Sequence, residues 1–193
     1  NRLNFFFFFP MFHCNGWCYP WTVPMLNGRT ICLRNIDVKK IFELIDKYNV
    51  THFGGAPIIL NMITGAPEAD RKKLKNKVYV LTAGAPPPSI IFKKMKDLGF
   101  EVMHVYGLTE TYGHVTQCAW NEEWDSFDED KQNEIKARQG VRYPNTEGVT
   151  IMDPETMKEV PQDGKTIGEI MIRGNVVMKG YFKDKAATDK AMA

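Results

Sequence analysis

Two oxygen-bearing side chains, Thr109 and Glu110, stand next to each other in a glycine-containing segment at residues 106–113. A glutamate carboxylate suits a hard cation such as Mg²⁺, and a threonine hydroxyl can donate a hydrogen bond to a phosphate oxygen. Tyr106 could stack its ring on a base. Glu110 alone is more typical of a solvated loop carboxylate, so its chemistry depends on what surrounds it.

Glycine-containing turns follow three runs that have strand character, at residues 54–57, 83–88 and 106–113. Ligands of open parallel sheets bind beyond the carboxyl ends of the strands. Glycine lets the backbone approach a ligand closely and adopt dihedrals that other residues resist. Three such turns on one sheet edge favour a pocket lined by main chain, as suits a flat heterocycle. Every sheet needs turns, however, so spacing alone leaves both interpretations open.

The elements that must position these turns alternate between strand and helix. Asp37 can cap the first helix, and Gly99 follows the third as a left-handed cap. The order predicts an α/β fold with a parallel sheet and crossover helices. Apolar spacing of three and four residues marks helices, and β-rich runs mark strands. The expected helices are residues 37–48, 58–63 and 89–98, the last with Ile90, Ile91, Met95 and Leu98 facing the core, and the expected strands are residues 5–9, 50–53, 78–82 and 100–105.

The residue composition and the expected elements change after about residue 118. A polar stretch there contains Ser126 and Glu129 at the spacing of a capping box, which predicts a helix that ends near Ala137. Short strands at residues 148–152 and 167–173 follow. We therefore expect an α/β subdomain over residues 1–140 and the start of a smaller β-rich subdomain over residues 141–193.

The composition excludes several classes of protein. The 193 residues carry 25 Lys and Arg against 23 Asp and Glu, a net charge of +2, which gives no electrostatic reason to expect nucleic acid or an anionic membrane as partner. The phenylalanine run at residues 5–9 is too short to span a bilayer. Four cysteines do not form a disulfide scaffold in a chain of this length, which favours a reducing compartment.

Other familiar sites are not favoured by the spacing. No glycines follow the G-x-G-x-x-G pattern of dinucleotide-binding folds. Residues 164–166 resemble the end of a P-loop, but Glu159 stands where its first glycine is required, so we interpret them as a hairpin turn. His104 and His114 lack a second ligand at zinc spacing, and the histidine and cysteines of residues 13–18 are more typical of ordinary packing.

Residues 106–110, Tyr-Gly-Leu-Thr-Glu, resemble the Y-G-x-T-E motif of the adenylate-forming superfamily, which contains acyl-CoA synthetases, luciferases and nonribosomal adenylation domains. Residues 10–17 resemble the H-x-x-G segment near its acyl pocket, residues 83–86 its adenine-lining turn, and residues 168–181 the opening of its β-rich subdomain. The residues of these segments are most similar to those of acyl-activating enzymes typified by plant peroxisomal acetate, butyrate and benzoate or cinnamate CoA ligases and their bacterial relatives.

The resemblance implies that a short- or medium-chain fatty acid, or an aromatic acid, is activated by ATP to an acyl-adenylate and passed to CoA. It implies that Thr109 and Glu110 are catalytic, Thr109 on the α-phosphate and Glu110 on Mg²⁺. The remaining implied contacts are Tyr106, Gly84, Ala85, Pro86 and Gly107 with the nucleotide, and His13, Gly16, Trp17 and Gly107 with the acyl group.

Two alternatives stay open: an adenylation domain that loads a carrier protein, and a non-catalytic nucleotide-binding module, against which Thr109 and Glu110 count. We expect the chain to be an internal fragment that is inactive alone, since the family's phosphate loop, its T-G-D segment and its C-terminal lysine are not found in it. The expected compartment is the cytoplasm, or the peroxisome for a plant-type protein. Neither the particular acid nor the oligomeric state follows from the sequence.

Overall fold

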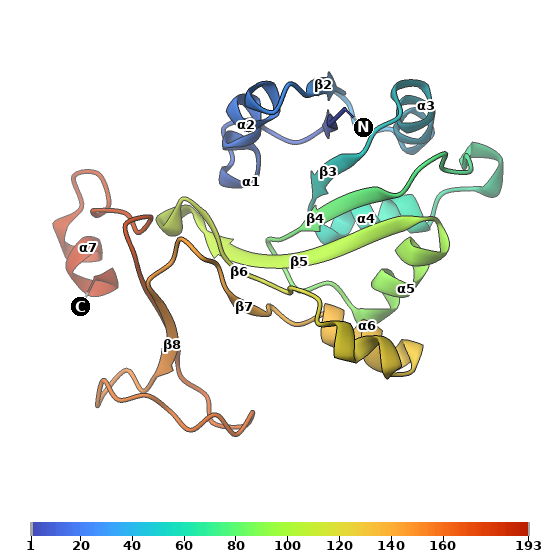
Figure 1. Ribbon diagram of the computed structural model, residues 1–193. Helices are drawn as coiled ribbons and strands as arrows, with labels where there is room; N and C mark the ends of the chain where they lie inside the picture. Colours follow the sequence, from blue (N-terminus) through green and yellow to red (C-terminus); the bar gives the residue numbers. More distant parts are fainter. Residues whose placement is uncertain (1, 193) are drawn as a thin grey trace.

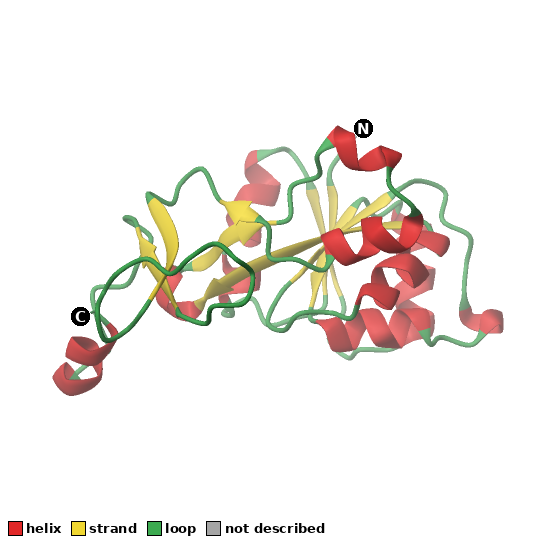
Figure 2. Cartoon of the chain, turned by 90° about the horizontal axis from the view of Figure 1, so that it is seen from below, coloured by secondary structure: helices red, strands yellow, loops and turns green. Residues whose placement is uncertain are grey.

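The computed structural model describes residues 2–192. Figure 1 shows a large sheet with helices beside it, and a C-terminal segment that lies at the other end of the molecule. The view from below in Figure 2 shows the same division, with the C-terminus at the end opposite most of the helices. None of the helices within residues 2–192 has the length and apolarity needed to cross a bilayer.

The large sheet contains seven strands, of which the first five are parallel to one another. The last two strands in the sheet order pair antiparallel. A mostly parallel sheet whose strands are joined by helices confirms the expected α/β class. In order across the sheet, the strands are β2 (Arg29–Cys32), β1 (Asn4–Phe7), β3 (His52–Gly55), β4 (Val78–Thr82), β5 (Phe100–Leu108), β6 (Gly113–Gln117) and β7 (Val141–Arg142).

The helices begin and end where local chemistry favours it. Asp37 caps α3 by accepting a hydrogen bond from the backbone nitrogen of Lys40 at 2.9 Å, and Gly99, with φ +91°, follows the end of α5. The helices are α1 (Cys14–Trp17), α2 (Tyr19–Met25), α3 (Val38–Tyr48), α4 (Pro57–Thr64), α5 (Ser89–Asp97), α6 (Glu129–Lys136) and α7 (Lys185–Ala191), with 3₁₀ turns η1 (Glu68–Asp70), η2 (Thr109–Thr111) and η3 (Glu122–Ser126).

The phenylalanine run forms a buried strand, as expected. Phe6 and Phe8 belong to the main core that α3, α4 and α5 cover, whereas Phe5 and Phe7 pack on the other side of the sheet against Val23 of α2. Alternate side chains of a strand point to opposite faces, so both faces are covered at β1. Apolar residues on both faces explain why this strand has no polar alternation.

The central strands are covered less completely. Val78 and Val80 of β4 are buried in the main core, but Tyr79 between them is 47% exposed and Met103 of β5 is 37% exposed. With Leu81, these two residues line a trough of about 730 Å³. We call Tyr79, Leu81 and Met103 the open face of the sheet.

Three local expectations were wrong or incomplete. Ile90 is 51% exposed, and Phe92 takes its place in the core beside Ile91 and Met95. The cap of α6 is Asp128, whose carboxylate accepts from the nitrogen of Lys131 at 2.8 Å, and not the box expected between Ser126 and Glu129. The sequence patterns also missed six short helices and strands, which are α1, α2, α7, β2, β6 and β7.

The second sheet consists of β8 (Gly148–Met152) and β9 (Glu169–Arg173), which pair antiparallel as a hairpin. Their positions confirm the short strands expected in this part of the chain. Residues 164–166 lie in the connection between them, where the Asp163 carboxylate accepts from the nitrogens of Lys165 and Thr166, each at 2.8 Å. Because β7 pairs with β6, it belongs to the large sheet. The boundary between residues 140 and 141 stays a prediction.

Candidate active site

The segment with Thr109 and Glu110 is the tip of a hairpin. Strand β5 continues past Val105 to Leu108, so residues 106–108 extend the strand instead of forming the expected turn. The turn is η2, after which β6 returns antiparallel. The buried hydroxyl of Thr111 closes it by accepting from the nitrogen of Leu108 at 3.0 Å and donating to the carbonyl oxygen of Gly113 at 2.8 Å.

A cleft of about 250 Å³ lies between this hairpin and the carboxyl ends of the parallel strands. Three residues from three separate sequence motifs line it: His13, Gly84 and Gly107. The structure thus brings together one residue each from the segments expected near the acyl group, the adenine and the phosphates. The full lining is Phe9, Pro10, His13, Ala56, Ala83, Gly84, Val105, Gly107, Gly113 and His114.

Two glycines shape the cleft for different reasons. Gly84 has φ +94°, and a Cβ placed on it would meet no atom within 4 Å, so its backbone is open to a ligand. A Cβ on Gly107 would lie 1.9 Å from the carbonyl oxygen of Gly113 across the hairpin. Only glycine therefore lets β5 and β6 approach this closely beside the cleft.

The other residues expected in the acyl pocket do not line the cleft. Gly16 is buried behind its wall, where a Cβ would lie 2.7 Å from the carbonyl oxygen of Pro10 and 2.8 Å from the ring of Phe9. Trp17 is 41% exposed and contacts Trp21, with 6.1 Å between the ring centroids. Gly16 therefore packs behind the cleft, and the acyl contact of both residues stays a prediction.

Three residues expected at the nucleotide also lie outside the lining. Ala85 and Pro86 are exposed beyond Gly84, and Tyr106 is half-buried on β5. Val105 and Gly107, on either side of Tyr106, both line the cleft, and the pairing of β5 with β6 shifts register between Tyr106 and Gly107. The stacking of Tyr106 on adenine stays a prediction.

Thr109 and Glu110 are not in the cleft lining; they follow Gly107 and Leu108 in the turn η2 at the tip of the hairpin. Thr109 is exposed and Glu110 is half-buried. The Glu110 carboxylate accepts a hydrogen bond from the hydroxyl of Tyr181 at 2.8 Å, and this bond raises the pKa of the tyrosine. The role of Tyr181 was not apparent from the sequence, because 71 residues separate the two partners.

A divalent cation bound at the hairpin tip would have one protein carboxylate, that of Glu110, as a ligand. Residues 2–192 contain no cluster of three or more His, Cys, Asp or Glu side chains that could enclose a metal. That donor set fits Mg²⁺, which is usually held by one or two carboxylates together with substrate phosphates and water. It does not fit a structural zinc site, which needs four ligands.

His114 lines the cleft although the sequence suggested only a rejected zinc ligand. It stands on β6 opposite Gly107, and its ring meets that of Tyr143 edge to face with centroids 4.7 Å apart. Burial lowers the pKa of His114 from the ordinary 6.5. At neutral pH the cleft therefore presents a neutral imidazole.

A cleft at the carboxyl edge of a parallel sheet, with glycine backbone in its lining, is typical of ligand-binding α/β proteins. The family described as AMP-binding enzyme matches residues 2–182. The chain belongs to this family, which confirms the resemblance seen in its motifs.

Several relatives make the likeness more specific. The chain is 52% identical over 186 residues to the peroxisomal acetate/butyrate–CoA ligase AAE7 of Arabidopsis thaliana, covering 95% of this chain and 32% of the relative. It is also 52% identical over 186 residues to the acetate–CoA ligase CCL3 of Humulus lupulus, covering 95% of this chain and 33% of the relative. The chain thus spans about a third of the length of these curated relatives.

Solved structures confirm the fold. The N-terminal domain of FACL13 from Mycobacterium tuberculosis matches 98% of this chain and 45% of its own, with a TM-score of 0.77 and 24% identity. The O-succinylbenzoate coenzyme A synthetase of Bacillus subtilis, in complex with ATP and a magnesium ion, matches 97% of this chain and 36% of its own, with a TM-score of 0.74 and 20% identity.

Proposed function

We propose that this chain is the AMP-binding part of a longer ligase that joins a short carboxylic acid to CoA with ATP. The observation that carries the proposal is the meeting of His13, Gly84 and Gly107 in one cleft. These residues come from separate motifs, so their convergence supports a shared substrate site. The names of the 52% identical relatives supply the reaction class.

The reaction has two steps. A carboxylate oxygen of the acid attacks the α-phosphorus of ATP, and the bond to the β-phosphate oxygen breaks to release pyrophosphate. The CoA sulfur then attacks the acyl carbon, AMP leaves, and the thiol proton passes to solvent. Mg²⁺ bound with ATP would neutralise phosphate charge in the first step.

The chain's own residues would stabilise the charge that builds up when two anions meet. The exposed hydroxyl of Thr109 would donate to the α-phosphate, and the carboxylate of Glu110 would hold the cation. The open backbone at Gly84 lets the flat base approach. Fixed donors and cations are the main source of catalysis where negative charge concentrates.

A short acid and free CoA are favoured over the alternatives. The curated relatives are named as ligases of acetate, butyrate and 2-methylpropanoate with CoA, which supports CoA over a carrier protein. Two relatives are named peroxisomal, so the peroxisome stands beside the cytoplasm as a proposed compartment.

The test is acid-dependent exchange of pyrophosphate into ATP, measured in a polypeptide that carries this chain at the length of its relatives. We expect exchange with acetate or butyrate, and we expect Thr109→Ala and Glu110→Gln each to lower it about a hundredfold, since removing one charge-stabilising group typically costs that much. Matched controls are Thr30→Ala and Glu122→Gln, which change exposed residues far from the cleft lining and should keep exchange within about twofold.

An intact, folded protein that bound ATP but showed no exchange with any short acid would contradict the proposal and favour a non-catalytic nucleotide-binding module. Exchange without transfer to free CoA would favour the carrier-protein alternative.

A further inference from the structure

Glu110 is held at two points by one segment of the C-terminal part. The nitrogen of Met178 donates to the carbonyl oxygen of Glu110 at 2.7 Å, and the hydroxyl of Tyr181 donates to Oε1 of its carboxylate at 2.8 Å. In Figure 1 the segment before α7 returns beside the tip of the β5–β6 hairpin. The main chain and the side chain of the same glutamate are therefore fixed together.

Tyr181 is itself held in place by α7. Its backbone nitrogen donates to Oγ1 of Thr188 at 2.9 Å, and that hydroxyl donates to the carbonyl oxygen of Asp184 at 2.7 Å. Asp184 also caps α7 by accepting from the nitrogen of Ala187 at 2.9 Å. A Cβ on Gly180, which has φ +148°, would lie 2.6 Å from Cγ2 of Thr188, so glycine is needed for this close contact.

The hydrogen bond gives the two oxygens of the Glu110 carboxylate different environments. Oε1 accepts from Tyr181, whereas Oε2 makes no hydrogen bond or ion pair with any residue in the described range 2–192. Fixing a glutamate side chain in one conformation has an entropic cost, because rotamer freedom is lost. Because Tyr181 already restricts the Glu110 side chain, this cost is lower for a cation that binds Oε2.

We propose that Tyr181 is a positioning residue, which orients Glu110 through Oε1 and leaves Oε2 available to a divalent cation. The inference deepens the proposed function and rests on it, because the cation in question is the Mg²⁺ of the nucleotide complex. Tyr181 touches neither substrate nor cation in this assignment. It acts only through the carboxylate of Glu110.

The experiment is Tyr181→Phe in the full-length ligase, with pyrophosphate exchange measured as a function of free Mg²⁺ at saturating ATP and acid. The ring stays and only the hydroxyl is lost. We expect the Mg²⁺ concentration for half-maximal rate to rise about tenfold, the lower end of the range for an outer-shell partner of a metal ligand. The rate at saturating Mg²⁺ should stay within about twofold, because the cation itself still fixes Glu110.

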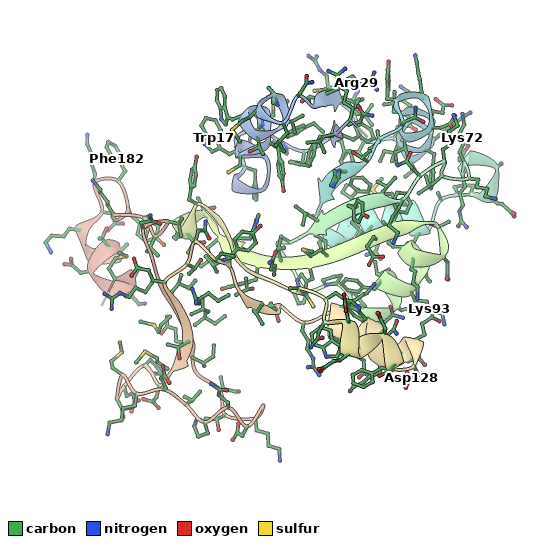
Figure 3. The ribbon with its side chains drawn as sticks, in the orientation of Figure 1. Trp17, Arg29, Lys72, Lys93, Asp128 and Phe182 are labelled. Atoms are coloured by element: carbon green, nitrogen blue, oxygen red, sulfur yellow. The ribbon has the colours of Figure 1, made fainter. Side chains whose placement is uncertain are left out.

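Two further variants give matched comparisons. Phe182→Leu changes the neighbouring residue, which is 89% exposed and points away from the body of the molecule in Figure 3, and should leave the Mg²⁺ dependence unchanged. Thr188→Val removes the acceptor for the nitrogen of Tyr181 and should raise the Mg²⁺ requirement by a smaller factor. A readout apart from activity is ATP binding measured by calorimetry at increasing free Mg²⁺, where Tyr181→Phe should need about tenfold more Mg²⁺ to reach the same ATP affinity.

An unchanged Mg²⁺ dependence in Tyr181→Phe overturns the proposal, as does an equal loss of rate at every Mg²⁺ concentration, which would indicate a structural role. An unchanged Mg²⁺ dependence of ATP binding in Tyr181→Phe overturns it without reference to activity. Failure of the proposed function appears differently, as a wild-type protein with no acid-dependent exchange at any Mg²⁺ concentration.

Discussion

A methyl group at Gly107 would lie 1.9 Å from the carbonyl oxygen of Gly113 and 2.5 Å from Cα of His114. Real Cβ atoms do not approach backbone so closely, and neither neighbour is a flexible side-chain end that could move aside. The two strands would have to separate at the point where both line the cleft. Gly107 therefore couples the integrity of the hairpin to the shape of the site.

We expect Gly107→Ala to lower the free energy of unfolding by at least about 2 kcal/mol, within the range for overpacking in a close-packed region. Gly148→Ala is the matched control, since its added Cβ would meet only Cβ of Arg173 at the ordinary distance of 3.8 Å. That control should change the free energy by no more than about 0.5 kcal/mol. Urea denaturation of both variants measures the difference, and equal losses would contradict this account.

At the level of single residues, the sequence predicted part of the site. Gly84 and Gly107 could be found because parallel strands deliver their carboxyl ends to one edge of a sheet, whereas His13 was predicted only from the family resemblance. His114 could not, because its place depends on the register that sets it opposite Gly107, next to a shift in the β5–β6 pairing. The contact between Glu110 and Tyr181 is a tertiary contact with no local signal.

At the scale of elements, amphipathic periodicity found α3 and α5 and the β-rich runs found β3, β4 and the core part of β5. The short strands β2 and β6 were missed, because four or five residues without clear alternation carry little pattern. The buried face of α5 was predicted correctly at Ile91 and Met95, but Phe92 is buried where Ile90 was expected. Packing against neighbouring elements decided where the short strands form and which side chains of α5 are buried.

The start of α6 provides a test at this scale. Asp128 accepts from the nitrogen of Lys131, whereas Ser126 donates to the carbonyl oxygen of Glu123 within η3. We expect Asp128→Ala to lower the free energy of unfolding by about 1 kcal/mol through loss of the cap. Ser126→Ala should cost clearly less, because it removes only an exposed turn contact. Thermal and urea denaturation check the order, and a larger effect at Ser126 would restore the capping box first expected there.

For the molecule as a whole, the most consequential surface is the open face of the sheet. Parallel sheets are nearly always covered on both faces, yet Tyr79 and Met103 are 47% and 37% exposed beside a trough of about 730 Å³. Exposed apolar patches of this kind promote association between molecules.

We therefore expect a polypeptide of these 193 residues to self-associate at micromolar concentration and to bind an apolar dye. The double variant Tyr79→Lys and Met103→Lys should reduce both effects. Ile167→Lys is the control, because that residue is 93% exposed in the second part of the chain and does not line the trough. Sedimentation velocity and dye fluorescence measure the change, and equal behaviour of the two variants would exclude the open face as the cause.

Strand β5 runs without interruption from Phe100, buried among the helices, to Leu108 beside the hairpin tip, so one element links the core to the site (Figure 1). Because successive side chains point to opposite faces, adding or removing one residue within it would turn Val105 away from the cleft or Phe100 out of the core. The exposed connection between β8 and β9 carries no such constraint. We therefore expect insertions and deletions to be tolerated better in that connection than in β5.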